Sequence, residues 1–110
     1  MALDDYLDYH PDVKQALADG RAVVALESTI ISHGLPWPTN RELALELEQI
    51  IRNNNAVPAT LGIINGRLKI GMTGDEVTDF AVGSHMVKVS RRDLGSVLAL
   101  GQSGATTVES

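Results

Sequence analysis

At 110 residues and a net charge of −5, the chain is long enough for one domain. Its acidic balance argues against a nucleic-acid partner, which would need a basic face. Hydrophobic residues make up 44% and charged residues 21%, as in globular proteins, and there is no cysteine for disulfide or thiolate chemistry. Its apolar runs are too short to cross a bilayer and its acidic N-terminus does not resemble a signal peptide, so we expect a cytoplasmic protein without a membrane partner.

The first elements in the chain are predicted to be a helix and a buried strand. Pro11–Asp19 is typical of a short helix, because proline is favoured in a first turn and Val13, Ala16 and Leu17 share one face. Ala22–Glu27 is a continuous apolar run that ends in a carboxylate, which predicts a strand covered on both faces.

A longer helix is predicted to follow the loop that ends at Pro38. Thr39 and Glu42 have the spacing of a capping box, and the run of asparagines at 53–55 stops the helix. Apolar residues at helical spacing predict the face that packs on the sheet, namely Leu43, Leu47, Ile50 and Ile51. The residues predicted to face water are Glu42, Glu46, Glu48 and Arg52.

The second half of the chain predicts a hairpin, two helices and a further strand. Ala56–Ile64 and 67–70 flank Asn65-Gly66, a strong hairpin turn. Capping boxes predict one short helix from Thr73 and another, over 91–100, from Ser90. The short strand Met86–Val89 lies between these helices, and the alternation indicates a layered α/β/α fold with a largely parallel or mixed sheet. These elements would leave part of the sheet uncovered, so we expect residues 1–110 to be a single α/β domain that is an incomplete part of a larger one.

Three stretches are candidates for chemistry. Glu27 is either a structural carboxylate that caps N–H groups or pairs with a lysine, or a general acid whose pKa is raised by apolar surroundings. Lys88 closes a strand just before a helix N-terminus, an arrangement that favours an anion, unless the arginines that follow are merely solvated. The loop 101–107, which ends in Thr107, has small residues and hydroxyl side chains that could hold a phosphate, but it is not a Walker loop.

Four long motifs carry a resemblance to a known family. They read ALESTIISHGLPWP, AVPATLGIINGRLKIGM, KVSRRDL and SGATTV, and they span roughly Pro11 to Val108. In this order they resemble the N-terminal portion of the pseudouridine-5′-phosphate glycosidase family and the related indigoidine-synthase-A-like proteins. The resemblance implies reversible cleavage of the C–C glycosidic bond of pseudouridine 5′-phosphate to uracil and ribose 5-phosphate. It also implies a manganese ion and, for the full-length protein, a homotrimer.

The resemblance also implies roles for individual residues. Glu27 matches the proton donor of the family, and Lys88 and Val108 match substrate-contacting positions, with Thr107 directly before Val108. The nucleophilic lysine and the metal-holding aspartate of the family are implied to lie beyond Ser110, so we assign no metal ligand in this chain. We therefore expect the segment to be inactive alone, and the alternative is a non-catalytic remnant or sugar-phosphate-binding module.

Overall fold

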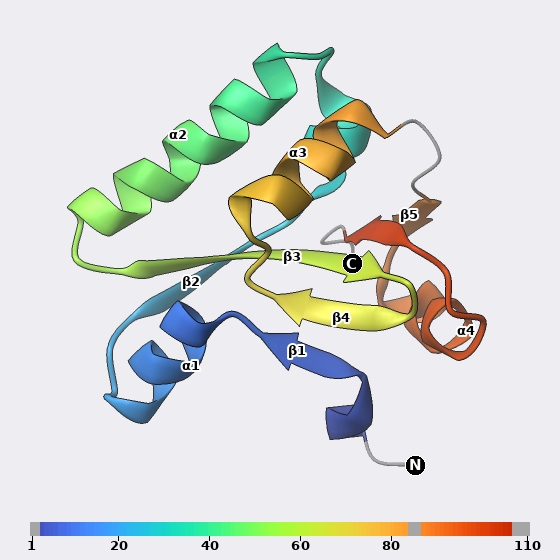
Figure 1. Ribbon diagram of the computed structural model, residues 1–110, viewed down its shortest axis with the longest axis horizontal. Helices are drawn as coiled ribbons and strands as arrows, with labels where there is room; N and C mark the ends of the chain where they lie inside the picture. The colour runs from blue at the N-terminus through green and yellow to red at the C-terminus, as the bar shows by residue number, and fades with distance from the viewer. Residues whose placement is uncertain (1–2, 84–86, 107–110) are drawn as a thin grey trace.

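The computed structural model describes residues 3–83 and 87–106, in which helices lie on both faces of one mixed sheet (Figure 1). The strands are β1 (Leu7–Tyr9), β2 (Val23–Leu26), β3 (Val57–Ile64), β4 (Arg67–Ile70), β5 (Val87–Val89) and β6 (Gly104–Thr106). The α-helices are α1 (Pro11–Ala18), α2 (Thr39–Asn53), α3 (Gly74–Val82) and α4 (Leu94–Ala99). Short helical turns are η1 (Leu3–Tyr6), η2 (Ile30–Gly34) and η3 (Arg91–Asp93).

The long strand β3 organises the sheet. Its first half pairs in parallel with β2, and its second half pairs antiparallel with β4 and β6. Strands β1 and β5 extend the sheet by parallel pairing with β4 and β6, which gives the order β1-β4-β3-β6-β5. Because β2 and β6 run in opposite directions along β3, their carboxyl ends point toward each other.

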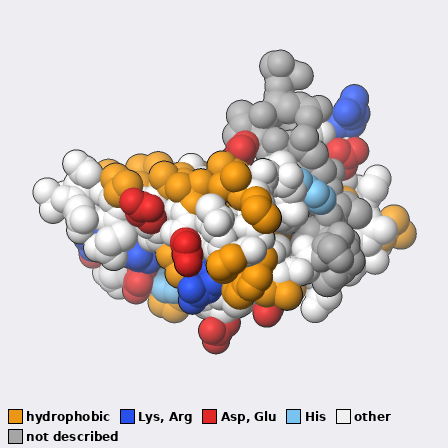
Figure 2. All heavy atoms as spheres, turned by 90° about the horizontal axis from the view of Figure 1, so that it is seen from above, with side chains coloured by type: hydrophobic (Ala, Val, Ile, Leu, Met, Phe, Trp, Pro, Cys, Tyr) orange, Lys and Arg blue, Asp and Glu red, His pale blue; other side chains and the backbone are white. Residues whose placement is uncertain are grey.

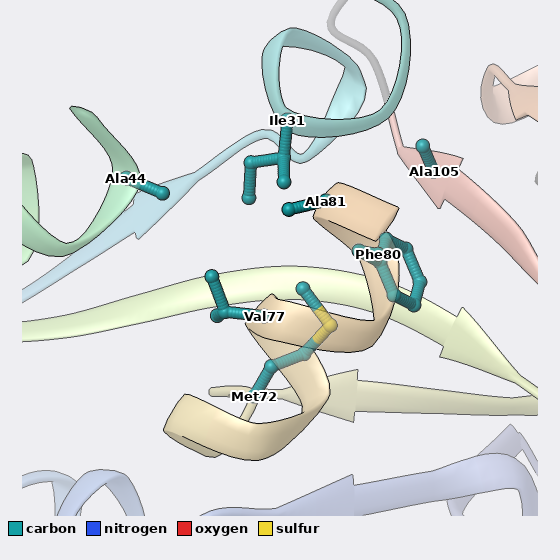
Figure 3. Packing of buried hydrophobic residues seen from close by; sticks show 7 residues of the cluster. All are labelled: Ile31, Ala44, Met72, Val77, Phe80, Ala81 and Ala105. Atoms are coloured by element: carbon teal, nitrogen blue, oxygen red, sulfur yellow. The ribbon is translucent and has the colours of Figure 1, made fainter. Parts of the chain in front are cut away.

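Alternation along β3 divides the core between the two faces. Val57 and Ala59 pack with α1, and Ile63 packs with α4. On the other face, helices α2 and α3 enclose a cluster in which Phe80 and Val77 are fully buried (Figure 3). The remaining members of this cluster are Ile31, Ala44, Met72, Ala81 and Ala105. The layered α/β/α fold with a mixed sheet is thus confirmed.

Local turn and capping chemistry follows the sequence closely in the second half of the chain. Asn65 and Gly66 both have positive φ, 49° and 76°, as a type I′ hairpin turn requires. Thr73 and Glu76 form the predicted capping box at the start of α3. By contrast, Thr39 is already helical, Pro38 precedes it as the N-cap residue, and no side-chain cap is formed there. Strand β6 was expected as a loop, and β1 was not expected.

The expectation that β2 is covered on both faces is wrong. Val24 is 39% exposed and Ala25, which points to the opposite face, is also exposed, so the described residues cover neither face of β2 fully. Among the described residues β2 also pairs only with β3, which makes it an edge strand there. Val23 packs toward α1, but Leu17 of that helix, predicted to share its buried face, is 53% exposed.

The predicted packing face of α2 is partly wrong. The buried stripe of the helix is Asn40, Ala44 and Glu48, at i, i+4 and i+8, although Glu48 was expected to face water. Ile50 is 49% exposed, and Leu47 is half-buried. The reason is that the two polar side chains find specific partners inside: the Asn40 amide donates to the carbonyls of Ile31 (2.7 Å) and Ala81 (2.8 Å).

Gly62 allows α3 to approach the sheet closely. A Cβ atom at this position would lie 2.6 Å from Sδ of Met72 and 2.9 Å from Cζ of Phe80. Both neighbours are buried in the cluster beneath α3 and have little freedom to move.

We therefore expect Gly62→Ala to lower the free energy of unfolding by about 1–3 kcal/mol through overpacking. Chemical denaturation measures this change. Gly95→Ala is the matched control, since nothing lies within 4 Å of its Cβ position and alanine is the better helix former there. Equal effects of the two substitutions would contradict this account.

An ion-pair network fixes β1 to β4. The Asp8 carboxylate accepts hydrogen bonds from Nη2 of Arg67 (2.6 Å) and Nζ of Lys69 (2.9 Å), and Lys69 also lies 3.6 Å from Glu76. The hydrogen bonds from Arg67 and then Lys69 hold the pKa of Asp8 well below its usual value. The hydrogen bond to Asp8 likewise raises the pKa of Lys69.

The Asp8 interaction should make stability depend on acid pH. Since the folded pKa lies below the unfolded one, the stabilisation is present above about pH 4 and is lost as the pH falls through the folded pKa. We expect Asp8→Asn to flatten the fall in unfolding free energy below that pH, as measured by urea titrations at several pH values. Asp79→Asn, on the exposed surface of α3, is the control and should leave the dependence of unfolding free energy on pH as in the wild type. If the curve for Asp8→Asn runs parallel to that of the wild type, the prediction is contradicted.

Candidate functional site

The carboxyl ends of β2 and β6 meet in a hydrogen-bonded junction. Ser28, which is fully buried, donates its N–H to the Thr106 carbonyl (3.1 Å), and its Oγ accepts from the Thr106 N–H (2.9 Å). The Thr29 hydroxyl donates to the same carbonyl (2.8 Å), and the Thr106 hydroxyl donates to the Leu61 carbonyl (3.0 Å). We call Ser28, Thr29 and Thr106 the β2–β6 junction. It fixes Glu27, the residue before Ser28, with respect to strand β6.

Glu27 borders a pocket of about 190 Å³ between β2 and α2. The rest of its lining is apolar apart from one hydroxyl and consists of Leu26, Ile30, Ile31, Ala44, Leu47 and Thr60. Glu27 itself is exposed, so the expected burial of this strand end is wrong. A carboxylate beside a small apolar pocket can present an acid or a base to a ligand bound there.

The topology brings the main chain of Lys88 to the same region. Strand β5 runs parallel to β6, with Lys88 in register with Ala105 and Val89 in register with Thr106. Strand β5, which carries Lys88, therefore lies next to β6. Strand β6 is in turn joined through the β2–β6 junction to Ser28, the residue that follows Glu27. The sequence also predicts that the side chains of Glu27 and Lys88 face a common cleft, because both residues close apolar strands of one sheet, and this stays a prediction. The other two predicted substrate-binding residues, Thr107 and Val108, lie outside the described residues.

The helix N-terminus expected after Lys88 takes a different form. A 3-10 turn, η3, precedes the six-residue helix α4, so no single helix spans 91–100. Ser90 donates its backbone N–H (3.2 Å) and its hydroxyl (3.0 Å) to the Asp93 carboxylate, and these bonds lower the pKa of Asp93. Two donors that an anion would have used are therefore already paired, which favours the structural interpretation of this turn.

The small-residue stretch 101–107 is only partly a loop. Gly104–Thr106 forms strand β6, and Ala105 is fully buried. Ser103, in the remaining loop, accepts the Asn65 N–H through its Oγ (3.0 Å) and so supports the hairpin turn.

Sequence reasoning missed a buried carboxylate behind the pocket. Glu48 is 6% exposed and accepts a 2.6 Å hydrogen bond from the Thr60 hydroxyl, with Arg52 at 3.4 Å on its other oxygen. Thr60 lies in register with Leu26 and lines the pocket beside Glu27. The i, i+4, i+8 spacing of Asn40, Ala44 and Glu48 is the signal that would have identified this polar stripe.

The described residues do not build a metal centre. Within 3–83 and 87–106 there is no grouping of three or more His, Cys, Asp or Glu side chains suited to a metal ion. These residues therefore do not fit a manganese site, and we derive no catalytic step through the metal. None of the helices in those ranges has the length and apolar content that crossing a membrane requires.

Comparison with known proteins places this chain in a family. The family model of the indigoidine synthase A like proteins matches residues 12–110. The chain belongs to this family. It is 55% identical to a pseudouridine-5′-phosphate glycosidase from Hahella chejuensis over 109 residues and to one from Deinococcus radiodurans over 108 residues. Both matches cover 98% of this chain but only 36% and 34% of those relatives, so the chain spans about a third of their length.

Two solved structures share the fold. A prealnumycin C-glycosynthase in complex with ribulose 5-phosphate superposes with a TM-score of 0.83 and 41% identity, covering 96% of this chain and 33% of that one. An indigoidine synthase A-like protein from Thermotoga maritima superposes with a TM-score of 0.79 and 29% identity, covering 93% and 32%. The fold of this segment therefore recurs within chains about three times its length.

The β2–β6 junction predicts the effect of removing one hydroxyl. Ser28→Ala leaves the Thr106 N–H without its acceptor, which should lower the free energy of unfolding by about 1–3 kcal/mol. Hydrogen exchange at the Thr106 amide should also accelerate, a local effect that general destabilisation of distant elements would not produce. Ser96→Ala, on the exposed surface of α4, is the control and should change little. An unchanged Thr106 exchange rate in Ser28→Ala would show that this bond does not hold the junction.

Proposed function

We propose that this chain forms the acid-bearing part of a pseudouridine-5′-phosphate glycosidase, which reversibly cleaves pseudouridine 5′-phosphate to uracil and ribose 5-phosphate. The observation that supports the proposal is the position of Glu27, held by the β2–β6 junction beside an apolar pocket, in a chain 55% identical to proteins of that name. The prealnumycin C-glycosynthase of similar fold was solved in complex with ribulose 5-phosphate, which supports a sugar-phosphate substrate for this chain as well.

In this proposal each residue has a separate task. Glu27 donates a proton to the uracil carbon as the C–C bond breaks and the bonding electron pair moves onto the base. Lys88, Thr107 and Val108 bind the sugar phosphate. The amine that attacks the anomeric carbon comes from the part of the family polypeptide that this segment does not match, as does the manganese ligand. The manganese requirement, the homotrimeric assembly and the cytoplasmic location belong to the proposal in the same way.

A second candidate is a sugar-phosphate-binding module without turnover. It is favoured by the prealnumycin C-glycosynthase structure in complex with ribulose 5-phosphate, because part of that structure has the same fold as this chain. The two candidates differ in one respect: the module binds ribose 5-phosphate but never releases uracil, whatever polypeptide is added.

The test is uracil release from pseudouridine 5′-phosphate in the presence of manganese. We expect no turnover by the chain alone, because the covalent route is lost when its nucleophile is absent. Coexpression with the unmatched portion of the Hahella chejuensis relative should restore turnover, and Glu27→Gln should then lower it by about 10²-fold or more.

Glu46→Gln, on the exposed face of α2, is the matched control and should leave turnover unchanged. Turnover by the short chain alone, at a rate near that of the reconstituted pair, would overturn the proposed division of labour. Full activity of Glu27→Gln in the pair would overturn the role of Glu27.

A further inference from the structure

Helices α1 and α2 end in the same way, at the end of the sheet where β2 and β3 begin (Figure 1). After α1, the Arg21 N–H donates to the Ala16 carbonyl (2.8 Å). After α2, the Ala56 N–H donates to the Ile51 carbonyl (3.2 Å). In both cases the residue before the donor has a positive φ, as a Schellman motif requires. The two motifs fix the main chain on either side of the start of the sheet.

A cleft of about 350 Å³ lies between these two helix ends. It is lined by residues 56–58 at the start of β3 and by the polar side chains of Asp12, Gln15, Arg21 and Arg52. On the face seen from above, Lys and Arg side chains lie in separate places (Figure 2), whereas the cleft brings two guanidinium groups to one cavity. Its volume falls in the range of small-molecule sites. We call this cavity the Arg21–Arg52 cleft.

The two guanidinium groups can bind an anion. Within residues 3–83 and 87–106, the Arg21 guanidinium forms no ion pair and no hydrogen bond. Nη2 of Arg52 lies 3.4 Å from Oε1 of Glu48, which is longer than a strong charge-assisted hydrogen bond, so this guanidinium keeps donors for a ligand. Phosphate is the anion that guanidinium groups match best, because each group offers two parallel N–H donors to two phosphate oxygens.

Asp12 and Gln15 add acceptors to the cleft. They lie at i and i+3 on α1 and so share one side of that helix. The Asp12 carboxylate repels a bare anion but accepts hydrogen bonds from hydroxyl groups. The Gln15 side chain donates through Nε2 to the Asp19 carboxylate (2.9 Å), which leaves its amide oxygen as an acceptor. The cleft therefore suits a ligand that carries both a phosphate and hydroxyl groups.

From these observations we propose that the Arg21–Arg52 cleft binds the phosphate monoester of a small polyhydroxylated molecule, that is, a sugar phosphate. Arg21 and Arg52 hold the phosphate, and Asp12 and the Gln15 amide oxygen accept hydrogen bonds from the hydroxyl groups. The cleft is separate from the candidate functional site. Arg21 precedes β2 by two residues and Glu27 directly follows that strand, so at about 3.3 Å per residue their main chains lie roughly 20 Å apart. The inference goes beyond the proposed function and does not rest on it.

The test is an NMR titration of the 110-residue chain, labelled with nitrogen-15, in about 0.15 M salt. The probes are ribose 5-phosphate, inorganic phosphate and ribose. Ribose 5-phosphate should shift the amide signals of Arg21, Ala56 and Val57 until they saturate. Inorganic phosphate should bind at least about tenfold more weakly, because it has no hydroxyl groups on carbon for Asp12 and Gln15. Ribose alone should leave these signals unchanged.

Three variants test the role of the guanidinium groups. Arg21→Gln should weaken the binding of ribose 5-phosphate at least about tenfold, because it removes charge-assisted hydrogen bonds. Arg52→Lys keeps a positive charge beside Glu48 but loses the planar fork, and it should weaken binding as well. Lys14→Gln is the matched control, since it removes one positive charge from α1 outside the cleft and should leave the affinity unchanged.

Saturable shifts at the cleft that Arg21→Gln weakens and Lys14→Gln does not would support the proposal. Equal weakening by these two variants would indicate general attraction of anions and would overturn it. Equal affinity for inorganic phosphate would overturn the assigned ligand class. The absence of shifts at the cleft, or shifts confined to the region of Thr106 beside the candidate functional site, would also overturn it. Uracil release by the reconstituted pair tests the proposed function separately, because no step of that reaction uses Arg21 or Arg52.

Discussion

The end-to-end meeting of β2 and β6 is the constraint on which the site depends. Strands β2 and β6 pair with the same edge of β3 and approach each other from opposite directions. At the gap between their ends, main-chain N–H and C=O groups fall outside the regular strand pairing and need other partners. Ser28 and Thr106 close the gap with reciprocal hydrogen bonds, and Thr29 adds a third. Because these groups are buried or half-buried, their bonds are costly to leave unmade, so the junction is held in one arrangement.

A second set of buried polar contacts holds α2 in place above this junction. The Asn40 amide spans carbonyls of η2 and α3, and Glu48 accepts the Thr60 hydroxyl from the middle of β3. These contacts set the rotation of the helix, since turning it to bury Ile50 would strand an amide and a carboxylate away from their partners. The pocket beside Glu27 depends on this placement, because its lining includes Ala44 and Leu47 of the helix and Thr60, the hydrogen-bond partner of Glu48.

The sequence predicted most of the fold because the signals were local. The hairpin at Asn65-Gly66 and the capping box at Thr73 and Glu76 depend on residues a few positions apart, and both formed as expected. Strands β1 and β6 were missed because each has only three residues and is defined by pairing with strands far along the chain. The burial of Glu48 was missed for the same reason, since its partner is twelve positions away on another element.

Only part of the candidate site could be predicted from the sequence. The motif at the end of β2 singled out Glu27, which lies beside a pocket, but its role as a proton donor stays a prediction. The exposure of Glu27 was not predicted, because no local pattern shows what covers the end of a strand. The sequence of an apolar strand does not show whether the strand has one or two paired neighbours, or which part of a polypeptide supplies the second one. The pattern along Ala22–Glu27 therefore describes a central strand, and the structure describes an edge strand.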